Sequence, residues 1–333
     1  MRSRLLGGAN VRSDRKIVAL FGGGRWGRAH ASNLSRLLTV HDRVIWVSQH
    51  NQSILRSTIA KFSKDGPQFD LRTSLDDGFR EHPATALVIT APGNHYAIAQ
   101  ACLRRGVHTF VEKPLSFQTS EARSLIDIAT RNNLILAVGL HLLSASYLRH
   151  FRSQLVKRAI SHIAIRWSDA DDEYRYGETK LVDRSTSIIH DVYPHIWSIV
   201  RSLTDCTQQK IKNVSMRESG AISIETQAGG VIVEAQCCRG AKARERKIAI
   251  RFLDDGSATL DFTQEPGIAT LDGILLPSDP LWGTGLTPVM AEVKEFLNQV
   301  SLRSRDPEWG PLAENFLDSV AGAEILNDRL TLT

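Results

Sequence analysis

The chain has 333 residues, more than twice the roughly 150 residues of a usual domain, so its length predicts two domains. Its 42% hydrophobic and 23% charged residues exclude collagen-like, coiled-coil and wholly disordered proteins. No apolar run approaches the roughly 18 to 20 residues that cross a bilayer, and no signal-peptide pattern opens the chain. We therefore expect no membrane partner.

The charge and the cysteines point to a cytoplasmic protein with a small anionic ligand. The four cysteines lack the spacing of metal ligands and predict reduced thiols. The net charge of +5 comes from 41 lysines and arginines that are spread along the chain. That spread argues against a nucleic-acid partner, and an anionic cofactor explains modest basicity equally well.

The first half alternates short apolar runs with helix-length segments, the pattern of a parallel sheet with crossover helices. Five runs are expected to form strands covered on both faces: 17–21, 44–47, 86–90, 109–111 and 134–138. The sequence predicts a mobile tail at residues 1–15 and a doubly wound α/β domain at residues 16–140.

From about residue 141, strand-like stretches follow one another without helices of comparable length. The expected strands are 163–167, 221–226, 230–237, 247–253 and 258–262. Several alternate apolar and polar residues, so one face of their sheet is expected to be wetter than the other. Helical segments at 289–300 and 312–326 close the chain. Residues 141–333 are therefore predicted to form an α+β domain with an open, mostly antiparallel sheet that binds substrate and supports oligomers.

The first strand leads into the loop GGGRWG, which precedes a helix-like segment. A G-x-G-x-x-G loop between a strand and a helix is typical of dinucleotide sites in Rossmann domains. Gly22 permits the tight turn, Gly24 lets the backbone approach a pyrophosphate, and Gly27 lets the helix pack closely. Free N–H groups at the helix start would bind the phosphates, beside Arg25 and Trp26. A glycine-rich turn without a ligand is the alternative.

The cofactor type follows from what lies about 20 residues after the last glycine. NAD sites usually carry an acid there for the ribose hydroxyls, whereas this chain has VSQHN. A carboxylate would repel a 2′-phosphate, so its absence removes the discrimination against NADP. Ser48 and Gln49 can donate hydrogen bonds to a phosphate, and Arg25 can add charge. The sequence favours NADP, although neutral residues also bind NAD.

The stretch GVHTFVEKP, residues 106–114, ends a strand in Glu112 and Lys113, followed by a proline that stops the strand. Lys113 is thereby delivered to the carboxyl edge of the sheet, where ligands bind in open α/β folds. A lysine there can polarise a substrate oxygen or shuttle a proton. A solvent-exposed lysine at a strand end is the ordinary alternative.

The stretch HDVYPH carries a second set of candidate groups. If Asp191 and His195 lie on helical backbone, their spacing of four puts them on one face, and Pro194 predicts that the helix starts close by. His195 can exchange a proton near neutral pH, with Asp191 as an orienting group. Alternatively, Asp191 caps the helix, or it joins His190 and His195 at a metal. Too few ligands are present for a metal, so none is expected.

Together these motifs resemble the Gfo/Idh/MocA family, named for glucose-fructose oxidoreductase, inositol dehydrogenase and a rhizopine-catabolism protein. The resemblance covers nearly the whole chain after the tail. It rests on the glycine loop, on APGNH at residues 91–95, and above all on residues 106–114, which are similar to the family's G-x-H-x-x-x-E-K-P signature. It implies a Rossmann domain paired with an open antiparallel sheet that commonly supports homodimers or homotetramers.

The resemblance also implies residue roles. The catalytic group would be Lys113, Asp191 and His195 around the reacting carbon, with either the lysine or the histidine as the main proton carrier. His141 would contact the substrate. Further cofactor contacts implied by the family are Ala91, Pro92, Asn94, His95, Glu112 and Lys113 itself.

The chain departs from the family pattern G-G-x-x-x-D-x-G-x-H-x-x-D. It has Thr186 and Ser187 for the paired glycines, Tyr193 for the later glycine and Ser198 for the final aspartate, and the usual arginine after His141 is missing. Tyr193 is expected to fill space beside the substrate, and these changes weaken the case for an ordinary polyhydroxylated sugar. Candidate substrate contacts from the second domain are Tyr193, Trp167, Tyr174, Arg175 and Tyr176.

Three functions fit the sequence. The leading hypothesis is an NAD(P)-dependent oxidoreductase acting on a carbonyl or alcohol carbon of a sugar-like or modified small molecule. The second is an NADPH-dependent imine reductase in a secondary-metabolite or siderophore pathway, as some relatives of the family are. The third is a regulator that senses a dinucleotide without turnover, against which the intact lysine, aspartate and histidine argue.

Overall fold

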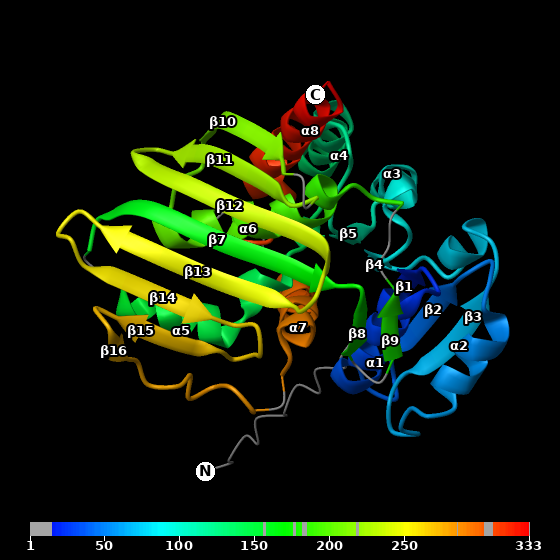
Figure 1. Ribbon diagram of the computed structural model, residues 1–333. Coiled ribbons are helices and arrows are strands. Elements are labelled where there is room, and N and C mark those ends of the chain that lie inside the picture. The colour runs from blue at the N-terminus through cyan, green and yellow to red at the C-terminus, as the bar shows by residue number, and fades with distance from the viewer. Residues whose placement is uncertain are drawn as a thin grey trace, which may run out of the picture.

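The computed structural model describes residues 15–155, 158–175, 178–181, 185–217, 220–284, 286–302 and 309–332. Nearly all of the tail predicted at residues 1–15 thus lies outside the described residues. Two large sheets organise the rest (Figure 1). One has six strands in the order β3-β2-β1-β4-β5-β6, and the other has eight in the order β10-β11-β12-β7-β13-β14-β15-β16. The predicted fold class is confirmed.

All strand pairs of the six-stranded sheet are parallel. Its elements are β1 (Ile17–Phe21), α1 (Arg25–Leu37), β2 (Arg43–Val47), α2 (Gln52–Ile59), β3 (Gln68–Arg72), η1 (Asp76–Phe79), β4 (Thr85–Val88), η2 (Pro92–Asn94), α3 (His95–Arg104), β5 (His108–Glu112), α4 (Thr119–Arg131) and β6 (Leu136–Gly139). The apolar runs are buried because helices cover both faces. The strand order reverses between β1 and β4, which opens a crevice at their carboxyl ends.

The second sheet is mixed, because β12 pairs with β7 in parallel while its other pairs are antiparallel. The elements of this half are η3 (His141–Ser144), α5 (Ser146–Gln154), β7 (Ile160–Ala170), β8 (Asp172–Arg175), β9 (Glu178–Leu181), α6 (Ile188–Thr204), β10 (Gln209–Met216), β11 (Ile222–Ala228), β12 (Val231–Ala241), β13 (Glu245–Phe252), β14 (Ser257–Asp261), β15 (Ile268–Leu271), β16 (Ile274–Leu275), α7 (Pro288–Leu302), η4 (Ala313–Phe316) and α8 (Leu317–Thr331).

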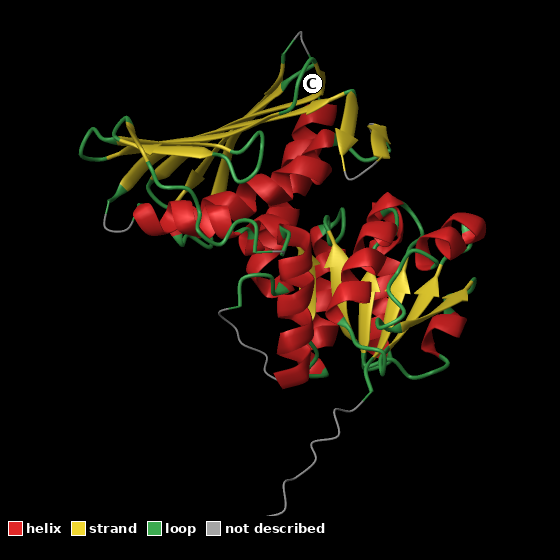
Figure 2. Cartoon of the chain, turned by 90° about the horizontal axis from the view of Figure 1, so that it is seen from below, coloured by secondary structure: helices red, strands yellow, loops and turns green. Residues whose placement is uncertain are grey.

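Burial alternates along the strands of this sheet, as in β13, where every second residue is buried. Helix α6 packs on one face, against β7, β11 and β12, and Figure 2 shows the helices gathered on that side only. The predicted contrast between a dry and a wet face is confirmed. Oligomer formation through the open face remains a prediction.

Helix α6 begins earlier than Pro194 suggests. It starts at Ile188, and its N-cap is Ser187, whose Oγ accepts a hydrogen bond from the backbone N–H of His190 at 3.3 Å. The alternative in which Asp191 caps the helix is therefore wrong. Pro194 lies inside the helix, where it lacks an N–H to donate to the preceding turn.

The last part of the chain returns to the first sheet. Helix α7 packs against α1 and β6, and Val293, Phe296 and Leu297 join the core on that face of the parallel sheet. The backbone N–H of Val138 donates to the carbonyl of Pro311 at 2.9 Å. A division of the sequence at residue 140 separates the two sheets, but α7 packs on the sheet of the first domain. No helix among the described residues is long and apolar enough to cross a membrane.

Glu292 of α7 is a buried acid with an unusual environment. It is 1% exposed, and neither carboxyl oxygen has a hydrogen-bond partner among the described residues. Burial raises its pKa well above the usual range, and the nearby charges of Glu112 and Glu295 raise it further. A neutral carboxylic acid is the form that such a site tolerates.

The Glu292→Gln variant should become increasingly more stable than the wild type as the pH rises. The folded protein holds the Glu292 proton more tightly than the unfolded chain, so the free energy of unfolding falls as the pH rises above about 4.3, the pKa of an unperturbed glutamate. Glutamine cannot ionise and removes that loss. The loss amounts to about 1.4 kcal/mol for each unit by which the pKa of Glu292 in the folded protein exceeds its pKa in the unfolded chain. Urea unfolding at several pH values between about 5 and 8 would measure this gain.

The matched control is Glu295→Gln on the same helix, because Glu295 accepts hydrogen bonds from Ser144 and Arg149 at 2.9 and 2.7 Å. Because the charge of Glu295 contributes to the raised pKa of Glu292, this control should gain less stability over the wild type with rising pH than Glu292→Gln does. An unfolding free energy of Glu292→Gln that runs parallel to the wild-type curve would mean that Glu292 is ionised in the folded protein.

Candidate active site

The glycine loop is fixed by its neighbours. Gly22 has a φ of 120°, and a Cβ there would lie 2.1 Å from the carbonyl oxygen of Ile89. A Cβ on Gly27 would lie 2.2 Å from the carbonyl oxygen of Gly22, so α1 packs tightly on the loop. The indole N–H of Trp46 donates to that same Gly22 oxygen at 2.7 Å. Both glycines are therefore required by the backbone itself.

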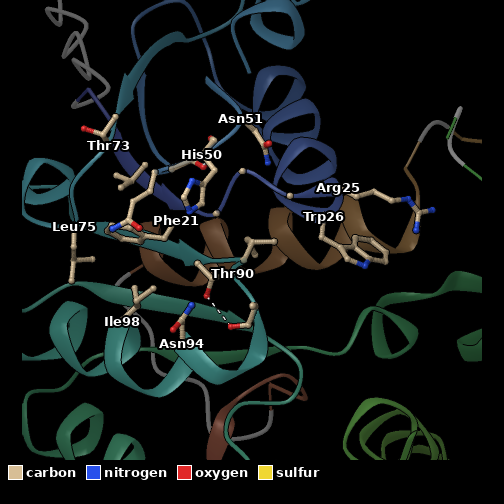
Figure 3. Close-up of a pocket in the computed structure, with 18 of the residues that line it drawn as sticks. Phe21, Arg25, Trp26, His50, Asn51, Thr73, Leu75, Thr90, Asn94 and Ile98 are labelled. Atoms are coloured by element: carbon tan, nitrogen blue, oxygen red, sulfur yellow. Dashed lines mark hydrogen bonds between the residues drawn. The ribbon is translucent and has the colours of Figure 1, made fainter. Parts of the chain in front are cut away.

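A cavity of about 610 Å³ opens beside this loop, between the ends of β1, β2 and β4 (Figure 3). A Cβ on Gly24 would meet no described atom within 4 Å, and no side chain caps α1 at this residue. The first turn of α1, with the positive end of the helix dipole, thus borders the cavity. These features fit the pyrophosphate of a dinucleotide.

The structure brings many of the predicted cofactor residues to this cavity. Its lining includes the expected Gly22, Gly24, Arg25, Trp26, Ser48, Gln49, Ala91 and Asn94. It also includes residues that the sequence analysis did not select, among them His50, Asn51, Thr73, Leu75, Thr90 and Ile98. Ser48 donates its hydroxyl to the carbonyl of His50 at 2.8 Å. Of these unselected residues, only His50 and Asn51 could have been found from the sequence, because they directly follow Ser48 and Gln49.

Five residues expected at the cofactor site do not line the cavity, namely Gly27, Pro92, His95, Glu112 and Lys113. His95 is 1% exposed, and its ring nitrogens lie 2.7 Å from the carbonyl oxygen of Pro114 and 3.0 Å from that of Thr90. Its side chain therefore braces the turn after Lys113, and its assignment as a cofactor contact was wrong. The sequence could not distinguish a cofactor contact from a support of this turn. His95 follows β4 at the carboxyl edge of the sheet, and both the cavity and the turn after Lys113 lie at that edge.

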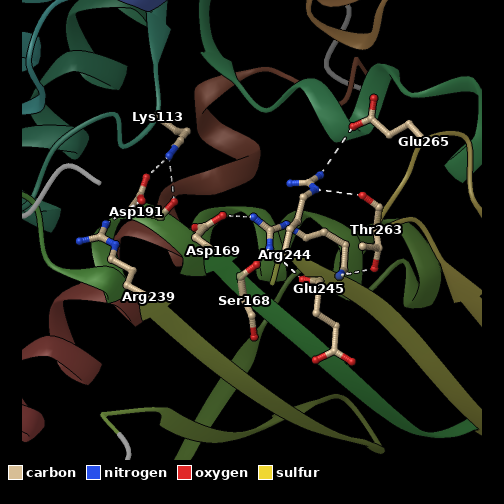
Figure 4. A network of polar contacts seen from close by, with 10 residues as sticks. Lys113, Ser168, Asp169, Asp191, Arg239, Arg244, Glu245, Thr263 and Glu265 are labelled. Atoms are coloured by element: carbon tan, nitrogen blue, oxygen red, sulfur yellow. Dashed lines mark hydrogen bonds and ion pairs between the residues drawn. The ribbon is translucent and has the colours of Figure 1, made fainter. Parts of the chain in front are cut away.

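Lys113 and Asp191 meet across the two domains. The ammonium of Lys113, at the end of β5, forms an ion pair with Oδ1 of Asp191 and donates to the backbone carbonyl of Asp191 at 3.0 Å. Arg239 of β12 donates to Oδ2 of the same carboxylate at 2.6 Å. Figure 4 shows these three side chains grouped together. Burial opposes ionisation of Asp191, but the charges of Lys113 and Arg239 outweigh it and lower its pKa, so the carboxylate stays ionised.

His195 lies beside this group, packed between two other aromatic rings. Its imidazole stacks on Trp167 with centroids 5.2 Å apart and planes at 11°, and His141 contacts it edge-on at 5.1 Å. His195 is 4% exposed, and its Nδ1 has no hydrogen-bond partner among the described residues. Burial lowers the pKa of His195 well below its usual range, and the charge of Lys113 lowers it further. The ring is therefore neutral near pH 7.

Two buried ion contacts support these groups. The guanidinium of Arg246 lies 3.9 Å over the indole of Trp167 and forms an ion pair with Asp169. Glu112 accepts hydrogen bonds from the ring of His30 and from the backbone N–H of Lys113, both at 3.1 Å. Burial opposes ionisation of Glu112, but the bond to His30 overcomes it and lowers the pKa of Glu112.

Tyr193 does not reach the site. Its side chain is 1% exposed, its hydroxyl donates to Oε1 of Gln209, and its ring lies against Gly322 of α8. The expectation that Tyr193 fills space beside the substrate was therefore wrong. Position 193 is two residues from both Asp191 and His195, so it faces another side of α6.

The alternative of a metal site gains no support. The ring of His190 bonds Ser187 through Nδ1 at 2.9 Å and packs on Phe117. No group of three metal-type ligands converges within the described part of the chain. Of the remaining substrate candidates, Tyr176 lies outside the described residues, while the backbone of Tyr174 and Arg175 belongs to β8.

Comparisons with known proteins agree with this fold. Residues 16–140 match the model of the Gfo/Idh/MocA oxidoreductase family, described as an NAD-binding Rossmann fold. A UDP-N-acetylglucosamine 3-dehydrogenase of Acidithiobacillus ferrooxidans is 25% identical over 251 residues, 72% of this chain and 74% of the relative. The solved structure under that name from the same organism aligns with a TM-score of 0.74 at 18% identity, over 96% of this chain and 98% of the other.

Two further solved structures share the fold. The scyllo-inositol dehydrogenase of Lactobacillus casei, with bound NAD(H) and scyllo-inositol, has a TM-score of 0.70 at 15% identity, over 96% of this chain and 97% of the other. A 3-ketoreductase of Actinomadura kijaniata, in complex with TDP-benzene and NADP, has a TM-score of 0.72 at 15% identity, over 94% and 97% of the two chains.

The Gly24→Ala variant should fold normally but bind a nicotinamide dinucleotide poorly. The backbone at Gly24 has a φ of −71°, which alanine adopts freely, and its Cβ would meet no described atom. That Cβ would occupy the space expected for the pyrophosphate and should weaken binding by about tenfold or more. Titration of NADH and NADPH fluorescence, together with thermal unfolding, measures both effects.

The matched control is Gly230→Ala, because its Cβ also meets open space but lies in the turn between β11 and β12. It should leave binding and melting temperature unchanged. Wild-type affinity in Gly24→Ala would show that the cofactor does not approach this loop.

Proposed function

Since the chain belongs to the Gfo/Idh/MocA family of NAD(P)-dependent oxidoreductases with an NAD-binding Rossmann fold, we propose that it transfers hydride between nicotinamide and a carbonyl or alcohol carbon of a sugar-like molecule. The observation that carries the proposal is the ion pair of Lys113 with Asp191 at the carboxyl edge of the parallel sheet. That edge also holds the dinucleotide cavity. An amine and a carboxylate there can handle the proton that hydride transfer requires.

The residues of the chain divide the proton chemistry between them. Lys113 carries the proton, and the carboxylate of Asp191 holds the ammonium in place. The imidazole of His195 acts as a neutral hydrogen-bond donor. We assign its proton to Nε2, because Nδ1 is buried without an acceptor among the described residues. Trp167 and His141 fix the plane of this ring through their contacts with it.

The substrate class rests on the relatives. Two similar proteins are named for dehydrogenation of UDP-N-acetylglucosamine and of scyllo-inositol, both polyhydroxylated rings. The core position of Tyr193 supports this proposal, because the side chain that replaces a family glycine takes no room from the substrate. A panel of nucleotide sugars, free sugars and inositols, assayed for change in NAD(P)H absorbance, tests it. Cofactor binding without turnover of any panel member would favour the dinucleotide-sensing alternative.

We propose NADP as the preferred cofactor. Residues 48–51, which follow β2 and line the cavity, include no acid. Ser48, Gln49 and Asn51 supply neutral polar groups there. A carboxylate about 4 Å from a 2′-phosphate would cost on the order of 4 kcal/mol at an effective dielectric of 20, so its absence leaves NADP acceptable.

The Ser48→Asp variant should shift preference from NADPH towards NADH. The new carboxylate would repel the 2′-phosphate and accept hydrogen bonds from ribose hydroxyls, changing the affinity ratio by about tenfold or more. The matched control is Ser53→Asp, which adds the same charge on an exposed part of α2 outside the cavity lining. Fluorescence titration with both cofactors measures the ratio. An unchanged ratio in Ser48→Asp would place the determinant elsewhere.

The Lys113→Met variant should lose about 10² to 10⁴ of turnover, the usual contribution of a general acid or base. Its NADPH affinity should change little, because Lys113 does not line the dinucleotide cavity. Steady-state kinetics with the best panel substrate and a binding titration measure the two effects. Lys247→Met, on the open face of the second sheet, is the matched control and should keep full activity. Undiminished kcat in Lys113→Met would remove the lysine from the reaction.

A further inference from the structure

Three glycines in succession, residues 22–24, form the turn that borders the dinucleotide cavity. The middle one, Gly23, stands at a position that the G-x-G-x-x-G pattern leaves open, and a Cβ there would lie 2.3 Å from Oγ of Ser48. The backbone therefore needs glycine at this position too. Glycine has more conformational freedom than any other residue, so a run of three gives a turn with little stiffness of its own.

Strand β2 supplies the contacts that fix this turn. The backbone N–H of Gly22 donates to the carbonyl of Val47 at 2.9 Å, and the carbonyl of Gly22 accepts from the indole N–H of Trp46 at 2.7 Å. Trp46 pairs in register with Leu20 of β1 and is fully buried, so the core holds its ring in place. Both backbone polar groups of Gly22 are thus bound by successive residues of one strand.

The direction of the Gly22 carbonyl matters to an anionic ligand. Its oxygen lies between β2 and α1, since it binds Trp46 and would lie 2.2 Å from a Cβ on Gly27. A carbonyl oxygen carries partial negative charge and would repel a pyrophosphate if it turned into the cavity. A trans peptide points its C=O and its N–H in opposite directions, so the bond from Trp46 also fixes the direction of the N–H of Gly23, which lines the cavity.

We propose that Trp46 is a positioning residue for the cofactor, because its indole N–H holds the Gly22–Gly23 peptide with the carbonyl turned away from the pyrophosphate. The identity of the ligand, a dinucleotide, rests on the proposed function. Without this N–H, the Gly22 carbonyl loses its donor inside the protein. A buried carbonyl without a donor is costly, so the glycine turn should rotate this oxygen into the cavity, where water can bind it. A pyrophosphate must then displace that water and reverse the rotation, which weakens binding.

The test separates loss of the N–H from loss of packing, and it uses the whole chain. Trp46→Phe removes the N–H together with part of the ring system. A second variant carries 3-benzothienylalanine at position 46, which keeps both fused rings and has sulfur in place of the N–H. The matched control is Trp197→Phe, because Trp197 is also buried and its Nε1 has no hydrogen-bond partner among the described residues. Thermal unfolding shows whether each variant folds.

Fluorescence titration with NADH and NADPH measures cofactor affinity, and competition by adenosine measures binding of the end that has no pyrophosphate. Both Trp46 variants should bind the preferred cofactor about tenfold more weakly, a factor within the usual cost of an unpaired buried carbonyl, with adenosine affinity unchanged. Trp197→Phe should change neither affinity. If Trp46→Phe does not fold, the isosteric variant still decides. Unchanged cofactor affinity in a folded Trp46 variant, an equal loss of adenosine affinity, or an equal loss in Trp197→Phe would overturn the proposal.

Hydrogen exchange gives a second readout that needs no ligand. Mass spectrometry of a peptide that covers residues 22–27 should show faster exchange in both Trp46 variants, because rotation of the carbonyl loosens the bond from the N–H of Gly22 to Val47. Trp197→Phe should exchange like the wild type. Faster exchange in a protein that binds neither cofactor would support the hold of Trp46 on the turn and overturn the proposed function. Cofactor binding with exchange and affinity unmoved by loss of the N–H would overturn the role of Trp46 and leave the proposed function standing.

Discussion

The ion pair between Lys113 and Asp191 is the contact on which the proposed site depends, because each partner belongs to a different half of the molecule. Lys113 follows β5 of the parallel sheet, and Asp191 lies in the first turn of α6, beneath the mixed sheet. Neither half contains the pair alone. The two sheets must therefore keep a fixed position relative to each other. The contacts of α8 with α4 and of α7 with α1 provide that support.

Ordinary folding interactions bring each partner to its place. Ser187 caps α6 and so fixes which residues of the helix face the site, putting Asp191 and His195 one turn apart. On the other side, Glu112 binds the backbone N–H of Lys113, and His95 contacts the carbonyl of Pro114. Residues next to a reactive group thus act as its supports. Their proximity in the sequence reflects this support and does not imply contact with a cofactor.

The sequence predicted features whose signals are local. Gly22 and Gly27 indicate a loop between a strand and a helix. The apolar runs of β1, β4 and β5 indicate strands without any knowledge of which strands they pair with. The edge strands β3, β10 and β16 and the neighbouring β15 were missed, because they are short or carry polar residues and so give no apolar run of strand length. Arg239 could not be found either. It lies 48 residues from Asp191, and only the fold of β12 over α6 joins them.

Tyr193 shows why a departure from a family motif needs a structure to be understood. On sequence alone, a tyrosine in place of a glycine two residues from both Asp191 and His195 would narrow the substrate site. In the fold, the helix turns this side chain towards α8, where Gly322 leaves room for the ring: a Cβ on that glycine would lie 2.7 Å from Cε1 of Tyr193. The exchange therefore belongs to the packing between α6 and α8. Selection of the substrate falls to the groups that do reach the site, among them His141, whose ring lies against His195.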